Sequence, residues 1–430
     1  MNNLFLRYYG RLNAPLLKRV SQQNIPALVA SSSFKICNIP STASLPARVL
    51  STSAPSSSDT NTDTVRGEIL DFSIDIRSLR PGDVISSPYE LTVSESIQDF
   101  WHSAFHSQDR ISTSTPFARK VGFQDRVLPF TLMLFLTSAM THVDKARIQL
   151  GFDGAIYHWP AFAGDTVTKS YRVKSIRNTS DGNHSIVHFA CELRNQRNRL
   201  IMSTTRHTMF PIPVPSSTIT SPPSQDTLSQ KFRDHFLNKS STLAELGSHS
   251  LISLSPGQLI LHTTNRCLTH TQSRQLASLA RITHARHFDT RTFHPDTELL
   301  IPGGLVLGLA LSASSRDLHE VLHEEMPRVS FVHAVHPNDV VGAMTYVKEV
   351  KELVGDLELL TVRTVGFKSG VISSWEELEF PVELFFTEGL STREVEAICR
   401  VHCPELSTKI VVIADRKIIR QANKKEAFLL

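Results

Sequence analysis

The sequence has no acidic residue before Asp59, although residues 1–50 carry six basic ones. The whole chain holds 45 basic and 41 acidic residues, so residues 51–430 keep 39 basic side chains against 41 acidic ones. This near-neutral body lacks the basic stripe with which proteins displace counterions from nucleic-acid phosphates. We therefore expect no nucleic-acid partner.

Long apolar runs and paired cysteines are also scarce. The longest apolar run, Leu299 to Ala313, is shorter than the ~18 residues of a membrane-spanning helix and contains a Pro-Gly-Gly sequence. Among the five cysteines only Cys399 and Cys403 lie close together, and a zinc site needs a second such pair. We predict no transmembrane segment, no metal site and reduced structural thiols.

The acid-free leader is rich in Ser, Leu and Ala, which is typical of a cationic transit peptide. Basic residues interrupt its apolar stretches, so a secretory signal fits less well, and Arg48–Ser51 resembles a mitochondrial processing site. We predict that residues 1–50 are a mitochondrial transit peptide that directs the protein to the matrix. The alternative is a disordered N-terminal tail without a targeting function. Residues 51–67, rich in Ser and Thr, are predicted to be disordered.

The remaining chain divides at a Pro/Ser-rich linker, predicted over residues 211–230. The two parts share short sequences. Pro81–Val84 recurs at 256, Leu91–Ser96 at 268, and Gly164–Val167 at 338, with offsets of 175, 177 and 174 residues. Nearly constant offsets indicate a tandem duplication of one domain. The predicted copies span residues 68–210 and 231–370, with a C-terminal extension over 371–430.

Each copy shows the same predicted elements. A first helix (94–105 and 271–279) precedes a longer apolar helix (129–141 and 304–313), and strands such as 185–191 and 359–365 follow. One apolar helix followed by antiparallel strands favours an α+β fold in which a sheet wraps around a buried helix. For the extension the pattern predicts a strand at 380–386, a helix at 391–401 and a strand at 408–413, without a partner in the first copy.

The second copy contains a candidate catalytic group. His287 and Asp289 lie two residues apart, so the imidazole can take a proton from water while the carboxylate orients the water or the ring. Gly303 and Gly304 open the apolar helix, whose N-terminal amides can stabilise a developing enolate oxygen. These groups suit the addition of water next to a thioester carbonyl.

The motif order resembles the double-hotdog MaoC-like hydratases, most closely the mesaconyl-CoA (2-methylfumaryl-CoA) hydratases. The resemblance rests on these motifs: Pro-Gly-Asp, Phe162-Ala-Gly-Asp-Thr166, Arg194-Asn-Gln196, and Arg281 to Asp289 followed by Gly303-Gly304. The resemblance covers about residues 68–370. It implies a tandem (double) hotdog, a coenzyme A or acyl-carrier thioester as substrate, and hydration without metal or organic cofactor.

Carried over by position, the resemblance supports His287 as the acid/base. The Asp or Asn that hydratases of this fold have five residues earlier is Ile282 here. The first copy has Ser112 and Ser114 at the positions of His287 and Asp289, so we expect it to be non-catalytic. Arg194 and Asn195 are candidate contacts to a coenzyme A phosphate, with an exposed strand end as the alternative.

The sequence therefore predicts reversible hydration or dehydration of an α,β-unsaturated acyl thioester, mesaconyl-CoA-like or enoyl-CoA/ACP, in mitochondria. A mitochondrial 3-hydroxyacyl thioester dehydratase is the closest enzymatic alternative. Ile282, Ser112 and Ser114 also favour a catalytically degenerate hotdog protein, a pseudoenzyme serving as a structural subunit of a mitochondrial complex. We expect a homodimer or a subunit of such a complex.

Overall fold

The computed structural model describes residues 67–218, 231–250, 252–289, 291, 299–370, 375 and 378–422. The predicted transit peptide, the disordered stretch up to residue 66 and most of the predicted linker lie outside these residues. The described residues from Ile69 onward form one compact unit. No helix among the described residues is long and apolar enough to cross a membrane.

The first half contains β1 (Val84–Ser86), β2 (Leu91–Thr92), α1 (Glu95–Phe105), α2 (Arg110–Thr113), α3 (Thr115–Val121), α4 (Phe130–Ser138), β3 (Ile148–Tyr157), β4 (Thr166–Asn178), β5 (Ser185–Asn195), β6 (Leu200–Phe210) and β7 (Ser217–Thr218). The second half contains α5 (Lys231–Asn238), α6 (Ser240–Leu246), β8 (Leu259–Leu261), α7 (His270–Leu279), η1 (Ala285–His287), α8 (Gly303–Ser314), β9 (Val321–Phe331), β10 (Val341–Glu352), β11 (Leu357–Lys368), α9 (Glu383–Phe386), α10 (Thr392–His402), η3 (Pro404–Leu406) and β12 (Ile410–Gln421).

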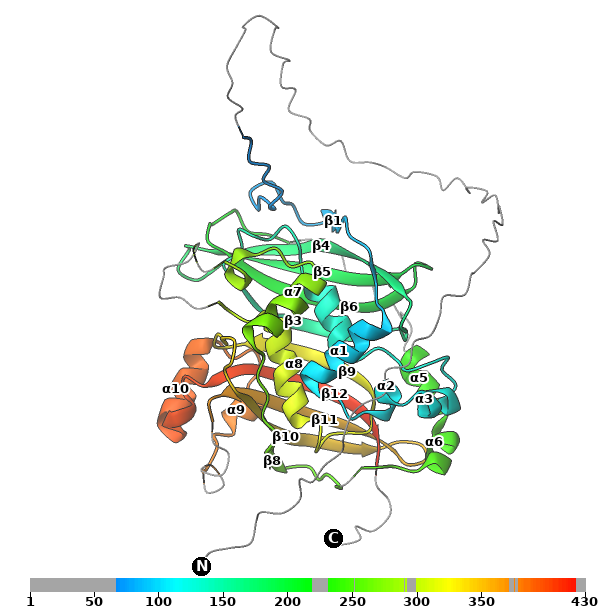
Figure 1. The fold of residues 1–430 in the computed structure, drawn as a ribbon. Helices are drawn as coiled ribbons and strands as arrows, with labels where there is room; N and C mark the ends of the chain where they lie inside the picture. The colour runs from blue at the N-terminus through cyan, green and yellow to red at the C-terminus, as the bar shows by residue number, and fades with distance from the viewer. Residues whose placement is uncertain are drawn as a thin grey trace, which may run out of the picture. The chain divides into compact units, whose positions relative to one another are not determined.

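The strands of both halves form a single antiparallel sheet in the order β1-β4-β5-β6-β3-β9-β12-β11-β10-β8. The order is symmetric about the β3–β9 junction, so each strand of one half holds the same position, counted from its own end of the sheet, as its counterpart in the other half. The sheet is continuous through the middle of the molecule (Figure 1). The α+β class and the tandem hotdog arrangement predicted from the sequence are confirmed.

The halves join where β3 pairs with β9, with Gly151 opposite Ser330 and Phe152 opposite Val329. At Gly151 a Cβ atom would lie 2.1 Å from the Val329 carbonyl oxygen. Any other residue would push the two strands apart, so this glycine permits the close contact between the halves.

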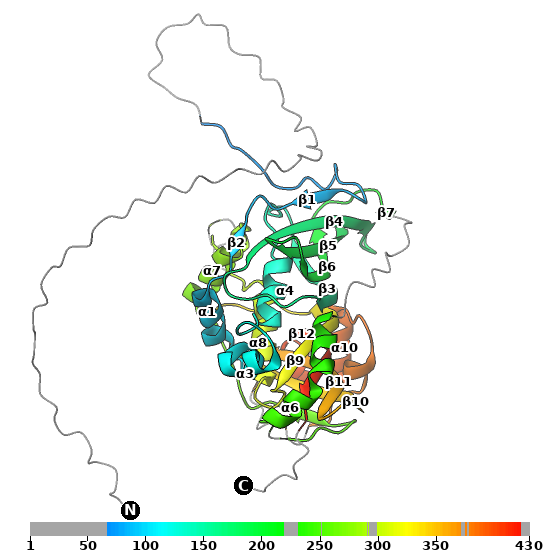
Figure 2. The same cartoon turned by 90° about the vertical axis from the view of Figure 1, so that its right-hand side faces the viewer.

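Two apolar helices, α4 and α8, lie against one face of the sheet, one in each half. Both are apolar around their circumference and almost fully buried, as expected for helices enclosed by a curved sheet. They also contact each other, and α1 of the first half packs on α8 of the second. Figure 2, turned by 90°, shows these helices on one side of the sheet.

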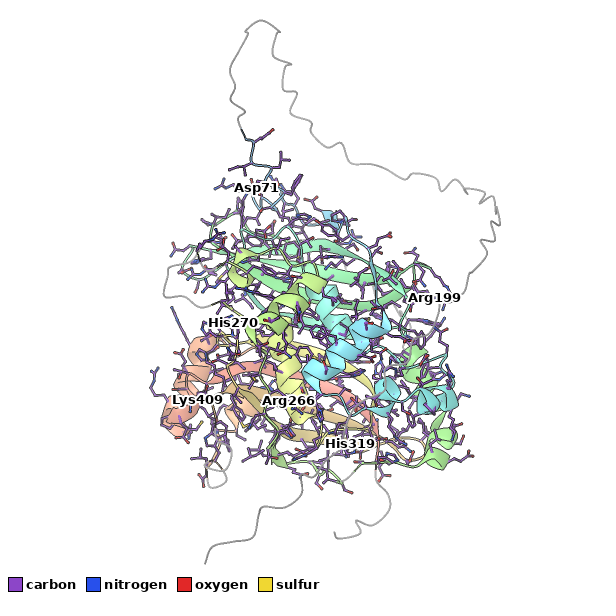
Figure 3. The ribbon with its side chains drawn as sticks, viewed as in Figure 1. Asp71, Arg199, Arg266, His270, His319 and Lys409 are labelled. Carbon is purple, nitrogen blue, oxygen red and sulfur yellow. The ribbon has the colours of Figure 1, made fainter. Side chains whose placement is uncertain are left out.

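The C-terminal segment differs from the prediction. Residues 383–386 form the short helix α9 where a strand was expected. The last strand, β12, lies between β9 and β11, the position that β6 occupies in the first half. It is therefore the final strand of the second hotdog, and residues 369–409 are an insertion before it. The two ends of this insertion are adjacent, because the Lys368 N–H donates to the Lys409 carbonyl at 2.9 Å. Figure 3 labels Lys409 at the end of the insertion.

The insertion covers the face of the second half opposite α8. Alternate strand residues point to opposite faces. Gly366 faces α8, where a Cβ atom would lie 2.7 Å from the Ala310 methyl group. Its neighbours Val365 and Phe367 instead belong to the buried cluster of α9 and α10, with Leu384 and Val395.

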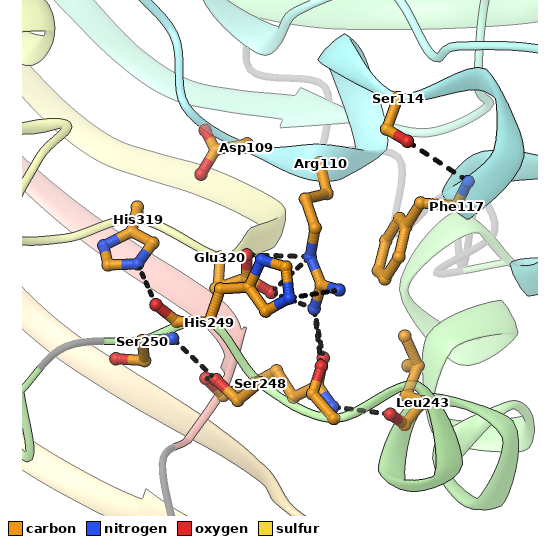
Figure 4. A network of polar contacts seen from close by, with 12 residues as sticks. Asp109, Arg110, Ser114, Phe117, Leu243, Ser248, His249, Ser250, His319 and Glu320 are labelled. Carbon is orange, nitrogen blue, oxygen red and sulfur yellow. Dashed lines mark hydrogen bonds and ion pairs between the residues drawn. The ribbon is translucent and has the colours of Figure 1, made fainter. Parts of the chain in front are cut away.

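A polar network ties the first half to the start of β9 (Figure 4). Arg110 of α2 binds both carboxylate oxygens of Glu320, at 2.9 Å from Nε to Oε1 and 2.6 Å from Nη2 to Oε2. The same guanidinium donates to the Gly247 carbonyl at 2.6 Å and lies 4.2 Å above the Phe117 ring. The Asp109 carboxylate accepts the Val321 N–H at 2.9 Å.

Candidate functional site

A cavity opens where the start of α8 meets the end of α4. Its empty volume is about 1000 Å³, including the part open to solvent. Both halves contribute to its wall. The wall includes Ser138, Gln149 and Arg206 from the first half and Ile282, His284, His287, Gly303, Gly304 and Phe331 from the second.

His287 lines this cavity at the end of η1. Its Nδ1 lies 2.8 Å from the Leu300 carbonyl oxygen, which can only accept a hydrogen bond. Nδ1 therefore carries the proton, and in the neutral ring Nε2 keeps its lone pair. Burial lowers the pKa of His287 to about 4, with a further contribution from the positive charge of Arg206. The ring is thus a neutral base at physiological pH.

His284 holds the loop that positions His287. Its Nε2 donates to the Ala146 carbonyl at 2.8 Å, and its Nδ1 accepts the Arg286 N–H at 3.1 Å. The two histidine rings have centroids 5.8 Å apart. Since both nitrogens of His284 are engaged, its role is to orient the loop, and His287 remains the base.

The N-terminus of α8 faces the same cavity. The Leu305 and Val306 N–H groups donate hydrogen bonds to the Pro302 carbonyl oxygen. The Gly303 and Gly304 N–H groups, which precede them, have no acceptor among the described residues. These amides and the helix dipole favour negative charge. A Cβ on Gly303 or Gly304 would lie within 3 Å of the Phe331 or Phe135 ring, respectively, so the glycines also make room for phenyl packing.

The other predicted site residues lie elsewhere. Asp289 pairs with Arg291, at 2.9 Å from Nε to Oδ1, and does not line the cavity. Arg194 binds Glu192 at 2.8 Å, and Asn195 accepts the Arg197 and Arg199 N–H groups in the β5–β6 turn. The short i to i+2 spacing lets Asp289 close a local turn with Arg291 rather than reach the cavity. His287, Gly303 and Gly304 are therefore brought together, and Asp289, Arg194 and Asn195 are not.

Ile282 lies on the cavity wall, and no Asp or Glu of the described residues lines this cavity. Among the polar residues on this wall are Arg206 of β6 and Gln149 of β3, and neither was predicted from the sequence. Arg206 follows the buried phase of its strand with Met202, Thr204, Thr208 and Phe210. A charged residue in the buried phase of an alternating strand is the signal that could have found it.

The first half has a counterpart cavity of about 780 Å³ at the start of α4. Its wall includes Ser112, Asp109, His323, Glu324 and Arg416. Ser112, at the position of His287, has no basic nitrogen. Within the described parts of the chain there is no cluster of three or more His, Cys, Asp or Glu that could hold a metal ion.

Comparison with known proteins supports the predicted resemblance. The FAS1-like dehydratase domain region matches residues 81–204. A β-methylmalyl-CoA dehydratase of Chloroflexus aurantiacus is 22% identical over 309 residues, covering 67% of this chain and 86% of that protein. A mesaconyl-CoA hydratase of Cereibacter sphaeroides is 24% identical over 254 residues, covering 56% of this chain and 72% of that protein.

Solved structures support the fold. A putative MaoC domain dehydratase of Chloroflexus aurantiacus superposes with a TM-score of 0.65 at 18% identity, covering 83% of this chain and 99% of its own. A conserved double-hotdog protein of Mycobacterium tuberculosis has a TM-score of 0.58 at 14% identity, with coverages of 82% and 100%. The chain thus has a double-hotdog fold, and its sequence is similar to MaoC-like hydratases and dehydratases.

Proposed function

We propose that the protein catalyses the reversible hydration or dehydration of an α,β-unsaturated acyl thioester. The observation that carries the proposal is one cavity that holds both a neutral histidine and the free N-terminal amides of α8. The curated relatives, named for acting on β-methylmalyl-CoA and mesaconyl-CoA, support the reaction class.

In this reaction His287 Nε2 would take a proton from water as the hydroxide adds to the β-carbon. Negative charge then develops on the thioester oxygen, where the Gly303 and Gly304 amides would donate hydrogen bonds. The protonated His287 would return its proton to the α-carbon, so both hydrogens and the oxygen of water end in the product. More specifically, we propose that the substrate is a mesaconyl-CoA-like, enoyl-CoA or enoyl carrier-protein thioester.

A second candidate is a catalytically degenerate hotdog protein that serves as a structural subunit of a mitochondrial complex. It is favoured by Ile282 and by a cavity wall without a described carboxylate to share the water with His287. In this case the cavity would still exist but would turn over no thioester.

The deciding experiment assays the purified full chain with mesaconyl-CoA, crotonyl-CoA and 2-enoyl carrier-protein thioesters, beside the His287→Ala variant. We expect hydration of at least one thioester and a loss of about 10²- to 10⁴-fold in the variant, the range for a general acid/base. Circular dichroism checks that the variant is folded. Absence of turnover with all three, or turnover indifferent to His287→Ala, would support the degenerate protein.

We also propose that this function belongs to the mitochondrial matrix. The basic, acid-free composition of residues 1–50 supports this location. A fluorescent protein placed behind residues 1–50 should enter mitochondria. Exclusion from the organelle would remove this part of the proposal and leave the reaction untouched.

A further inference from the structure

Arg206 is a buried cation in the cavity of His287 that has no carboxylate partner among the described residues. Its side chain rises from β6, and the residue is only 8% exposed. Nε donates to the Thr208 hydroxyl at 3.0 Å and Nη1 to the Ser138 carbonyl at 2.5 Å, so both acceptors are neutral. The negative end of α4 lies at Ser138 and offsets only part of the charge.

The second half contains an arginine that corresponds to Arg206. This residue is Arg416 of β12, which is 4% exposed. Arg206 binds Ser138 at the last residue of α4, and Arg416 Nη1 donates to the Ser314 hydroxyl at the last residue of α8, at 3.4 Å. The two arginines thus hold equivalent places. Arg416, however, forms an ion pair with the Glu324 carboxylate through Nε.

The strand register shows what stands at the position of Glu324 in the first half. Glu324 of β9 is paired with Ile418, two residues after Arg416. Gln149 of β3 is paired with Thr208, two residues after Arg206. Gln149 therefore replaces the glutamate. Its amide Nε2 is buried and has no hydrogen-bond partner in the part of the chain that the structure describes.

The consequence is a cavity with a net positive wall. A buried charge is tolerated when an opposite charge pairs with it, and Glu324 supplies that charge for Arg416. In the His287 cavity no described carboxylate does so. Arg206 and Gln149 instead offer N–H donors, the complement of a carboxylate with two acceptor oxygens.

We propose that Arg206 and Gln149 form an anion subsite that binds a second carboxylate on the acyl group of the thioester. The proposal rests on the proposed function only in placing an acyl thioester in this cavity. A phosphate of coenzyme A is the other anion that such a substrate carries. Because Arg206 is 8% exposed while Arg147 of the same cavity is an exposed cation, we assign the phosphates to the rim and the carboxylate to Arg206.

Binding of two saturated thioesters tests this without requiring catalysis. Succinyl-CoA and butyryl-CoA have acyl chains of equal length and differ in the terminal carboxylate or methyl group. By calorimetry with the full chain we expect succinyl-CoA to bind about 10- to 100-fold more tightly, the range for hydrogen bonds to charged groups. Coenzyme A alone measures the share of its phosphates.

Two variants should remove this preference. Arg206→Met removes the cation, and Gln149→Glu supplies an internal carboxylate at the position of Glu324. Both should bring the two affinities within about threefold of each other, well below the effect of a charged hydrogen bond. If Arg206→Met does not fold, Gln149→Glu still decides, because it adds a partner to a buried charge. Arg172→Met, which removes an exposed arginine from β4 of the same sheet, is the matched control and should leave the preference unchanged.

Equal binding of the two thioesters to the wild-type chain, binding of neither, or a preference that persists in both variants would overturn the subsite. Preferential binding of succinyl-CoA without hydration of any enoyl thioester would retain the subsite and reject the proposed reaction. Hydration of crotonyl-CoA without any preference for succinyl-CoA would do the opposite.

Discussion

His287 determines the pH range in which the proposed chemistry can run. Burial lowers its pKa from 6.5 to about 4, so the ring stays neutral and basic well below neutral pH. We predict that kcat/KM for hydration is level from pH 8 to about 5 and halves near pH 4. An acid limb centred near 6.5 would contradict this assignment. Circular dichroism at each pH separates loss of activity from unfolding.

The same pKa shift has a thermodynamic counterpart. The unfolded chain protonates His287 near 6.5 and the folded chain only near 4, so the unfolded state binds more protons between these values. This residue therefore favours the fold above pH 6.5, and the advantage is lost as the pH falls toward 4. His323 in the counterpart cavity, with its pKa also lowered to about 4 by burial, acts in the same direction.

Residue patterns predicted part of the site. His287 and the Gly303–Gly304 pair were recognisable because a short motif places them in a loop and at the start of a helix. Arg206 and Gln149 were not, because each is an ordinary residue of a strand. Their meaning comes from strand pairing across the sheet, which a single sequence does not display.

At the scale of elements, the insertion before β12 explains why the predicted second copy ends at residue 370, before its last strand. The early motifs repeat at offsets of 174 to 177 residues, but Arg206 and Arg416 are 210 positions apart. The additional residues form α9 and α10. The sequence pattern therefore assigns β12 to a C-terminal extension, whereas in the structure it pairs with β9 and β11 inside the sheet.

The insertion is a structural cover for the sheet. Leu384 of α9 is fully buried against the strands, and no residue of α9 or α10 lines the His287 cavity. We predict that Leu384→Ala lowers the free energy of unfolding by about 2–5 kcal/mol, the range for buried leucines, and leaves kcat/KM of the folded protein unchanged. Val382→Ala, at a residue 58% exposed, is the control. Equal effects of the two substitutions in urea unfolding would contradict this packing.

At the scale of the whole molecule, the Arg110–Glu320 ion pair joins the halves. The Glu320 side chain is 1% exposed and that of Arg110 15% exposed, so little solvent is available to replace the pairing. We predict that Glu320→Gln lowers the free energy of unfolding by about 2–4 kcal/mol, because it leaves a largely buried guanidinium unpaired.

Glu388→Gln provides the control for that ion pair. Its carboxylate pairs with Arg328 at 3.8 Å but is 80% exposed, and exposed pairs contribute at most about 1 kcal/mol. Denaturant titrations of both variants should therefore differ clearly. A loss for Glu320→Gln no larger than for Glu388→Gln would show that this ion pair does not stabilise the contact between the halves.

The duplication leaves two related cavities with different chemistry. The counterpart cavity contains the paired Arg416 and Glu324, and the other contains His287 and Arg206, for which no described carboxylate is a partner. We interpret this asymmetry as division of labour between the copies: one keeps an internal ion pair, and the other exposes a base and a cation to a ligand.

The central claim is that the cavity of His287 carries the reaction. Each cavity holds one described histidine whose pKa is lowered to about 4, so His287→Gln and His323→Gln form a matched pair. The most direct measurement is kcat/KM for thioester hydration by these two variants of the full chain. We predict a loss of at least about 100-fold for His287→Gln and a change within about threefold for His323→Gln. Equal losses, or a larger loss for His323→Gln, would contradict the account.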